Sequence, residues 1–147
     1  MWNLLFFNPV LVVVFISWGA AQTLKFLIKA FQGDVNFYNF ITTGGMPSGH
    51  STVICALATA IGFSSGFTSP LFAVTVAIAI IIMHDAVVIR GAAGRQARIL
   101  NRLIDKYQEE LKEHHLKVKL GHTPFEVVVG SFLGIAIALL LWDLFYV

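Results

Sequence analysis

Residues 44–51 read Gly-Gly-Met-Pro-Ser-Gly-His-Ser, and an apolar stretch of helical length follows them directly. Proline fixes one residue of the turn, and glycine lets the backbone come close to a ligand. Ser48 is a good N-cap for a helix that runs on to about Phe67. A helix start offers unpaired N–H groups and the positive end of the dipole, and both favour an anion. His50 in the first turn can exchange a proton with that anion. A glycine-rich turn with an ordinary serine cap is the alternative interpretation.

The composition is that of an integral membrane protein. The chain has 147 residues, of which 57% are hydrophobic and 12% are charged, and its mean hydropathy is +0.79. Water-soluble domains are about 25% charged. We therefore expect one all-α, membrane-embedded domain over residues 1–147. The single cysteine, Cys55, excludes an internal disulfide and a thiolate-based zinc site.

Hydropathy predicts four membrane-spanning helices, each long enough for a hydrocarbon core of ~30 Å. They cover about residues 9–31, 48–67, 71–90 and 124–142. The hydrophilic stretch 91–121 has apolar residues at helical spacing, which predicts an amphipathic helix at about 95–116 that lies on the membrane or pairs with a partner helix. The expected fold is a helical bundle with about four transmembrane helices and one cytoplasmic amphipathic helix.

Two signals mark the start of the last helix. Residues 123–126, Thr-Pro-Phe-Glu, predict a capping box with proline at the first helical position. His122 precedes Glu126 by four residues, so the carboxylate can instead hold one ring nitrogen and leave the other nucleophilic. Both interpretations stay open, and one carboxylate can serve both. Farther on, Gly130 and Gly134 form a small-xxx-small face for close helix packing.

The distribution of positive charge predicts the topology. Eight of the ten Lys and Arg residues lie in residues 90–119, and the other two are Lys25 and Lys29. The positive-inside rule places 90–119 in the cytoplasm. With four spans, both termini then lie outside, and the candidate polar groups gather at the cytoplasmic face. Lys25 and Lys29 share one helix face and either reach the interface or face an anion.

Ionisable residues also end the third membrane helix, where such groups usually face a partner or a cavity. Asp85 forms an ion pair with Arg90 or with Lys29 in one interpretation. Arg90 belongs to an anion site in the other. Arg95 lies near the same helix end and is a second candidate for that site.

The gathered groups suit phosphoryl transfer. Cations and helix N-termini bind phosphate. One histidine can attack phosphorus while a second protonates the leaving oxygen. The sequence has no thiolate cluster and no His-Glu-x-x-His pattern, so we expect neither a metal nor another cofactor.

These residues resemble a known superfamily. Residues 47–50, Pro-Ser-Gly-His, match the second signature of the type 2 phosphatidic acid phosphatases, a superfamily that includes the vanadium haloperoxidases. Residues 121–130, Gly-His-Thr-Pro-Phe-Glu-Val-Val-Val-Gly, look like its third signature, in which a histidine precedes an acidic residue by four. Over nearly the whole chain the pattern resembles a divergent branch of small bacterial and plant members.

The resemblance implies a role for each matching residue. His122 would be the nucleophile that forms a phosphohistidine, Glu126 would orient it, and His50 would be the general acid for the leaving group. The groups implied to hold the phosphate are Ser48, the Gly49 backbone and Lys25.

The arginines of the signatures are absent. Gln32 and Gly33 stand where an Arg-Pro pair follows the lysine of the first signature, and His115 and Leu116 stand where the third has a Ser-Arg pair. We expect Arg90 and Arg95 to supply the missing charge. A homodimer that completes the site is a further expectation.

The expected function is that of a multi-pass cell-membrane phosphatase. It would hydrolyse a lipid phosphomonoester or diphosphate, such as a phospholipid or a polyprenyl phosphate, at the cytoplasmic face. One alternative is a non-catalytic lipid-phosphate binder or translocation partner. The other is a structural adaptor that recruits a partner through the amphipathic helix. None of the three involves nucleic acid.

Overall fold

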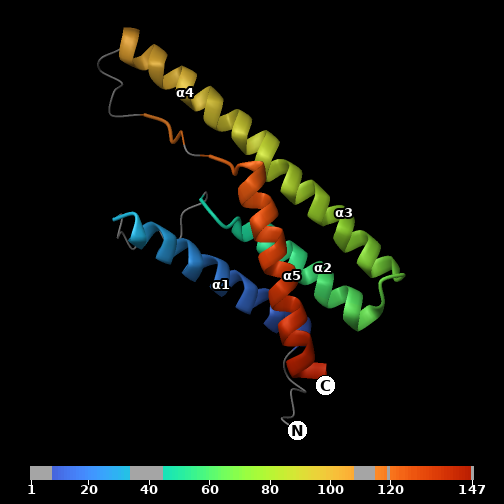
Figure 1. The fold of residues 1–147 in the computed structure, drawn as a ribbon. Helices are drawn as coiled ribbons and strands as arrows, with labels where there is room; N and C mark the ends of the chain where they lie inside the picture. The colour runs from blue at the N-terminus through green and yellow to red at the C-terminus, as the bar shows by residue number, and fades with distance from the viewer. Residues whose placement is uncertain (1–7, 34–44, 108–114, 119, 147) are drawn as a thin grey trace.

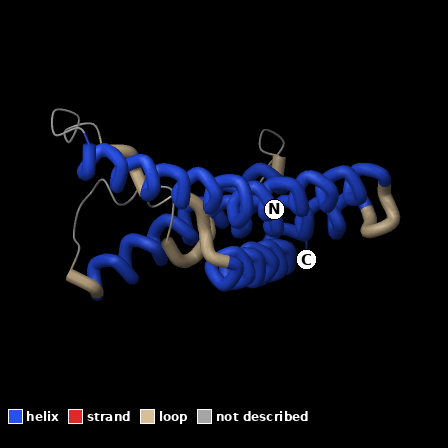
Figure 2. The backbone as a smooth tube through the Cα atoms, turned by 90° about the horizontal axis from the view of Figure 1, so that it is seen from above, coloured by secondary structure: helices blue, strands red, loops and turns tan. Residues whose placement is uncertain are grey.

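The described part of the chain is helical. The computed structural model describes residues 8–33, 45–107, 115–118 and 120–146, and these contain helices and loops but no strand (Figures 1 and 2). The elements are α1 (Pro9–Phe31), α2 (Gly49–Ser65), α3 (Pro70–His84), the π-helical turn η2 (Asp85–Ile89), α4 (Arg90–Tyr107) and α5 (Pro124–Tyr146).

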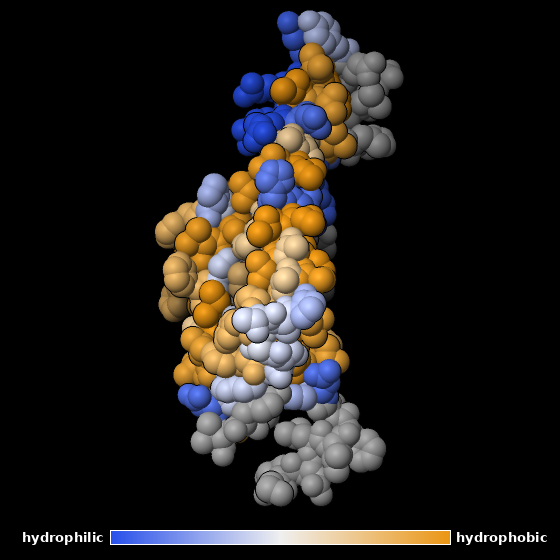
Figure 3. Space-filling model, turned by 90° about the vertical axis from the view of Figure 1, so that its right-hand side faces the viewer, coloured by the Kyte–Doolittle hydropathy of each residue, from blue (hydrophilic) through white to orange (hydrophobic). Residues whose placement is uncertain are grey.

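Among the described residues, three segments are long and apolar enough to cross a membrane. They are Pro9–Phe31, Pro70–Tyr107 and Pro124–Leu144. Apolar side chains cover most of the middle of the face seen in Figure 3, and hydrophilic ones gather over its upper end. The all-helical fold is therefore confirmed, and three of its segments are candidate membrane spans. The second predicted span corresponds to α2, which has 17 residues and is shorter than these three.

The third predicted helix does not end at Arg90. α3, η2 and α4 form one continuous helix of 38 residues, and Figure 1 shows α4 projecting beyond the other helices. The charged residues mark a change of environment and not a helix end. Gly94 does not break the helix either. A Cβ there would lie 2.7 Å from the Val118 carbonyl oxygen, so the glycine permits close approach of the returning chain.

The predicted amphipathic helix is present as α4, which is described as far as Tyr107. Residues 108–114 lie outside the described ranges, and residues 115–118 are not helical, so the helix does not extend to residue 116 as predicted. The Asn101 side chain donates to the Leu116 carbonyl and accepts from the Leu116 N–H, both at 2.9 Å. This side chain replaces the backbone partners that a helix would have given Leu116.

α2 packs directly against α5 through the predicted glycine face. A Cβ on Gly130 would lie 2.5 Å from the Ser48 carbonyl oxygen, and one on Gly134 would overlap the Thr52 carbonyl. The prediction of close packing at these glycines is confirmed. α1 completes the core, whose buried residues are Val13, Ala56, Ala60 and Ala138.

The two ends of the bundle differ in character. At one end, Phe63 stacks on Trp142 with ring centroids 5.0 Å apart, and it meets Phe67 edge-on at 5.2 Å. At the other end, α1 finishes while α2 and α5 begin (Figure 1). Backbone hydrogen bonds tie the second end together. The Ser48 N–H donates to the Glu126 carbonyl at 3.1 Å, and the His122 N–H donates to the Ala86 carbonyl in η2 at 2.9 Å.

Candidate active site at the joined helix starts

Ser48 caps α2 from a fully buried position. Its Oγ accepts hydrogen bonds from the Ser51 N–H at 3.4 Å and the Ser51 hydroxyl at 3.0 Å. The Thr52 hydroxyl donates to the Ser48 carbonyl at 2.9 Å. The predicted N-cap is therefore confirmed. Gly49 is also buried, yet a Cβ built on it would meet nothing within 4 Å, so there is open space beside this first residue of α2.

One carboxylate oxygen makes both interactions that the sequence left open at the start of α5. Oε2 of Glu126 accepts a hydrogen bond from the Thr123 N–H at 3.1 Å, and the Glu126 N–H donates to the Thr123 hydroxyl at 3.2 Å. The same Oε2 lies 3.1 Å from Nδ1 of His122. An imidazole held this way carries its proton on Nδ1 and has a lone pair on Nε2.

The two histidines lie beside each other although 72 positions separate them in the chain. Their ring centroids are 6.4 Å apart, with the planes inclined at 65°. The His122 side chain is 3% exposed, whereas His50 is exposed. The glycine-permitted contact of α2 with α5 and the Ser48–Glu126 hydrogen bond set this spacing. The His122 ring is therefore shielded from solvent and hydrogen-bonded to Glu126, whereas the His50 ring is open to solvent.

Lys25 is buried beside the glycine loop. It is 3% exposed, and its Cγ lies 4.0 Å from the position that a Cβ on Gly45 would occupy. Gly45 has a φ of +87°, a conformation that favours glycine. Lys25 acts electrostatically on both imidazoles, and Lys29 is close enough to act on Lys25. Lys25 is thus the lysine of α1 that lies near both histidines, with Lys29 beside it.

Arg90 forms the ion pair with Asp85 and also influences the histidines. Its Nε donates to Oδ2 of Asp85 at 2.7 Å, which favours this pair over one between Asp85 and Lys29. Arg90 acts electrostatically on both His50 and His122. The sequence left open whether Arg90 pairs with Asp85 or belongs to an anion site. The structure shows the ion pair with Asp85, and Arg90 is also close enough to act on His50 and His122.

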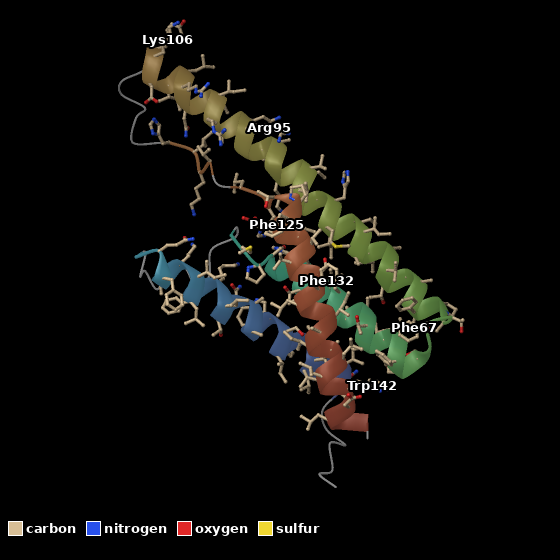
Figure 4. The ribbon with its side chains drawn as sticks, in the orientation of Figure 1. Phe67, Arg95, Lys106, Phe125, Phe132 and Trp142 are labelled. Carbon is tan, nitrogen blue, oxygen red and sulfur yellow. The ribbon has the colours of Figure 1, made fainter. Side chains whose placement is uncertain are left out.

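Arg95 lies farther along α4. It is exposed, and Figure 4 labels it on α4 beyond the start of α5, which Phe125 marks. Among the described residues, the cations that act on both imidazoles are Lys25 and Arg90. The structure therefore brings Arg90 to the two histidines, and Nη1 of Arg95 lies 3.6 Å from the position that a Cβ on Gly91 would occupy, next to Arg90.

Burial has the largest effect on the pKa of His122 and lowers it below the ordinary value of 6.5. The hydrogen bond and the charge of Glu126 act in the opposite direction, while the charges of Lys25 and Arg90 lower it further. The net result is an imidazole that stays neutral at neutral pH. Such a ring can attack an electrophile through Nε2.

Sequence reasoning missed two features that position His122. The first is η2, whose Ala86 carbonyl accepts the His122 N–H; π-turns in longer helices are frequent at functional sites but have no simple sequence signal. The second is Gly121, which has a φ of +89° and whose Cβ would lie 2.7 Å from the Gly91 nitrogen. The sequence signal for this turn was the glycine at position 121, directly before the candidate nucleophile His122.

The positions where the third signature has its Ser-Arg pair lie away from the histidines. Nε2 of His115 lies 3.0 Å from Oδ1 of Asp105 on α4, and Leu116 is bonded to Asn101. Within the described ranges, no group of three His, Cys, Asp or Glu side chains could hold a metal ion.

Comparison with known proteins identifies the family and a relative of this chain. A family model described as "Divergent PAP2 family" matches residues 6–137. A Bacillus subtilis (strain 168) protein described as "Uncharacterized membrane protein YuiD" is 37% identical over 135 residues, which cover 82% of this chain and 85% of that protein. No solved structure matches.

Proposed function

Because this chain belongs to the divergent PAP2 family, we propose that it is a membrane phosphatase that hydrolyses a lipid phosphomonoester or diphosphate through a phosphohistidine. One observation carries the proposal. The rings of His50 and His122 lie 6.4 Å apart, and Glu126 holds Nδ1 of the second ring. Because a hydrogen bond reaches about 3 Å, this spacing lets both rings reach one phosphoryl group.

The first half of the reaction transfers the phosphoryl group to His122. The Nε2 lone pair attacks phosphorus in line with the lipid oxygen. The N–P bond forms while the P–O bond to the lipid breaks, and the leaving oxygen takes a proton from protonated His50. The lipid alcohol leaves, or the lipid monophosphate in the case of a diphosphate. Glu126 stabilises the positive charge that develops on the phosphorylated imidazole.

The second half hydrolyses the phosphohistidine. The exposed position of His50 lets water reach phosphorus from the side that the lipid has left. Neutral His50 takes a proton from the water as its oxygen attacks, the N–P bond breaks, and the electron pair returns to Nε2 of His122. Inorganic phosphate is released, and both histidines regain their starting states.

The phosphate site combines a helix start with cations from other elements. The room beside Gly49 receives the phosphate oxygens, which the first N–H groups of α2 bind. Ser48 Oγ accepts two hydrogen bonds, so its own O–H can donate to an oxygen. Lys25 and Arg90 balance the charge. Two further cations attract the lipid from outside the site, namely Lys29 and Arg95.

The site faces the cytoplasm in this proposal, and α2 is the fourth span. Seventeen residues of α-helix cover about 26 Å, which is near the lower limit for a membrane-spanning helix. α2 begins at the site itself, below the level that α4 reaches (Figure 1). With four spans, the basic residues of α4 and the C-terminal end of α1, with Lys25 and Lys29, lie on one side.

A lipid-phosphate binder without turnover is the second candidate function. It is favoured by the departures at Gln32 and Leu116, where the signatures of the superfamily have arginines. This candidate predicts that the protein binds lipid phosphates and that His122→Asn leaves the affinity unchanged. It also predicts that no inorganic phosphate is released.

Phosphate release by the purified protein in detergent tests the proposal. Phosphatidic acid and a polyprenyl diphosphate serve as substrates. We expect His122→Asn to abolish release and His50→Asn to lower kcat by about 10²–10⁴-fold, the usual contribution of a general acid. The matched control is His115→Asn, which removes a histidine that pairs with Asp105 away from the site. Release that survives His122→Asn would exclude this nucleophile.

A further inference from the structure

A buried polar atom on α1 has no hydrogen-bond partner in the described part of the chain. The Gln22 side chain belongs to a residue that is 9% exposed, and its Oε1 accepts no hydrogen bond among the described residues. An amide oxygen shut off from water in this way is unfavourable, and bound water or a ligand usually explains it. Oε1 can only accept, so the missing partner is a donor.

Gln22 lies next to the proposed phosphate site. It precedes Lys25 by three residues and Lys29 by seven, so all three share one face of α1. Three residues of helix correspond to about 4.5 Å along the axis. α1 ends where α2 and α5 begin, so Gln22 lies on the bilayer side of Lys25 (Figure 1).

A lipid phosphate bound at Lys25 extends its chain toward the bilayer centre. The first atoms after the phosphoester oxygen then come to the level of Gln22. In a glycerol-based lipid these atoms include the carbon next to the phosphoester carbon. That carbon carries a free hydroxyl in a lysolipid phosphate, an ester in phosphatidic acid, and no oxygen in a polyprenyl phosphate.

We propose that Gln22 Oε1 accepts a hydrogen bond from a substrate hydroxyl one carbon away from the phosphoester. This inference rests on the proposed function and narrows its substrate class. The preferred substrates are lipid phosphomonoesters with a free hydroxyl at that carbon, such as lysophosphatidic acid. A substrate without the hydroxyl leaves Oε1 unpaired, and sites of this kind discriminate strongly against such analogues.

A second unpartnered atom provides a matched control. Ser17 is fully buried, and its Oγ also lacks a partner among the described residues. It precedes Lys25 by eight residues, or about 12 Å along the helix, which is beyond the atoms next to a phosphoester. Ser17→Ala therefore removes an unpartnered polar group from the same helix without touching the proposed subsite.

The test compares lysophosphatidic acid with its 2-deoxy analogue of the same acyl chain in mixed micelles. We expect kcat/KM of the wild-type protein to be about tenfold or more higher for the hydroxyl-bearing substrate. Gln22→Met keeps the size of the side chain but removes the acceptor, and it should bring the ratio close to one. Ser17→Ala should leave the ratio unchanged. A wild-type ratio of one, or a preference that survives Gln22→Met, would overturn the subsite.

A binding measurement separates this inference from the phosphatase proposal. The unfolding temperature of the His122→Asn protein is measured with each ligand, and we expect a larger rise with the hydroxyl-bearing one. Adding Gln22→Met should abolish the difference. Selective binding together with no hydrolysis by the wild-type protein would overturn the phosphatase and keep the subsite. Equal binding of both ligands would indicate that water fills the position and would overturn the subsite. Absence of binding and hydrolysis would overturn both.

Discussion

At the scale of single residues, Oε2 of Glu126 makes two interactions. It accepts the Thr123 N–H that starts α5, and it holds Nδ1 of His122. The start of α5 and the proposed nucleophile therefore depend on the same atom. A defect at Glu126 alters the helix start and the tautomer together, and the two effects need separate measurements.

Replacement of Glu126 by Gln should change the pH dependence of kcat/KM. In the proposed mechanism His122 reacts in its neutral form. Burial holds its pKa below 6.5, so the acid limb of the wild-type profile should have its midpoint below pH 6.5. The carboxylate of Glu126 raises this pKa, so its loss should move the midpoint to lower pH. We also expect kcat to fall by about 10²-fold, because the imidazolium-like transition state loses its counter-charge.

Asp105→Asn is the control for this profile, since it removes the carboxylate that pairs with His115 on α4. It should leave both the midpoint and kcat unchanged. A midpoint that rises in Glu126→Gln would contradict the assigned role of the carboxylate.

The local part of the site could be predicted from the sequence. His122 and Glu126 are four residues apart, and Ser48 directly precedes an apolar helix, so helical geometry alone indicates their contacts. Which arginine acts on both histidines could not be predicted in this way; in the structure it is Arg90. It depends on how η2 turns the long helix and on where the chain returns from α4, and neither has a local pattern.

At the scale of elements, the distance between the two histidines is set by the seam between α2 and α5, that is, the close contact of Gly130 and Gly134 with Ser48 and Thr52. Gly134→Ala places a methyl group against the Thr52 carbonyl, and we expect it to lower the free energy of unfolding by about 1–3 kcal/mol. Thermal unfolding in detergent measures the effect. Gly19→Ala on α1 is the control, because a Cβ there meets nothing within 4 Å. Equal stability of the two variants would contradict the close packing at Gly134.

The turn before α5 should be sensitive to a single methyl group. Gly121→Ala combines a positive φ with a clash against the Gly91 nitrogen, so it should displace His122 and lower kcat by at least about tenfold. Phosphate release measures the loss. Gly33→Ala has a similar φ of +82° but open space around its Cβ, and it should retain activity. Comparable losses in both variants would show that backbone strain alone is responsible.

The elements themselves were largely predictable, but their ends were less so. Apolar length located the membrane helices, and glycine spacing located the seam between α2 and α5. The change to charged residues at Arg90 was interpreted as a helix end, although α4 continues the helix to Tyr107. Hydropathy reports the surroundings of a segment, whereas backbone hydrogen bonding decides where a helix stops.

At the scale of the whole molecule, the proposed topology can be tested by cysteine labelling. In a Cys55→Ala background, single cysteines replace the exposed residues Gln32, Thr68 and Lys106. We expect an impermeant maleimide to label Thr68→Cys in intact cells, and to label the other two only after permeabilisation. Labelling of Gln32→Cys and Lys106→Cys from opposite sides would show that α2 does not span the membrane.

The family could be predicted from the two signatures, and the family match confirms that prediction. The predicted homodimer stays a prediction. The residues of the proposed active site come from the end of α1, the start of α2, the start of α4, and the turn before α5. The charge distribution predicted that these residues gather at one end of the bundle, and the resemblance implied that they share a site. Their distances and contacts required the structure, because no sequence spacing relates Lys25 to His122.

The most direct test of the proposed mechanism is to trap the phosphorylated enzyme. The protein is mixed with a lipid phosphate labelled in its terminal phosphoryl group and is quenched within one turnover in base, in which phosphohistidine survives. We predict one acid-labile phosphate on Nε2 of His122, no label in His122→Asn, and normal labelling in His115→Asn. Phosphate release without any covalent label, or labelling that persists in His122→Asn, would contradict the phosphohistidine mechanism.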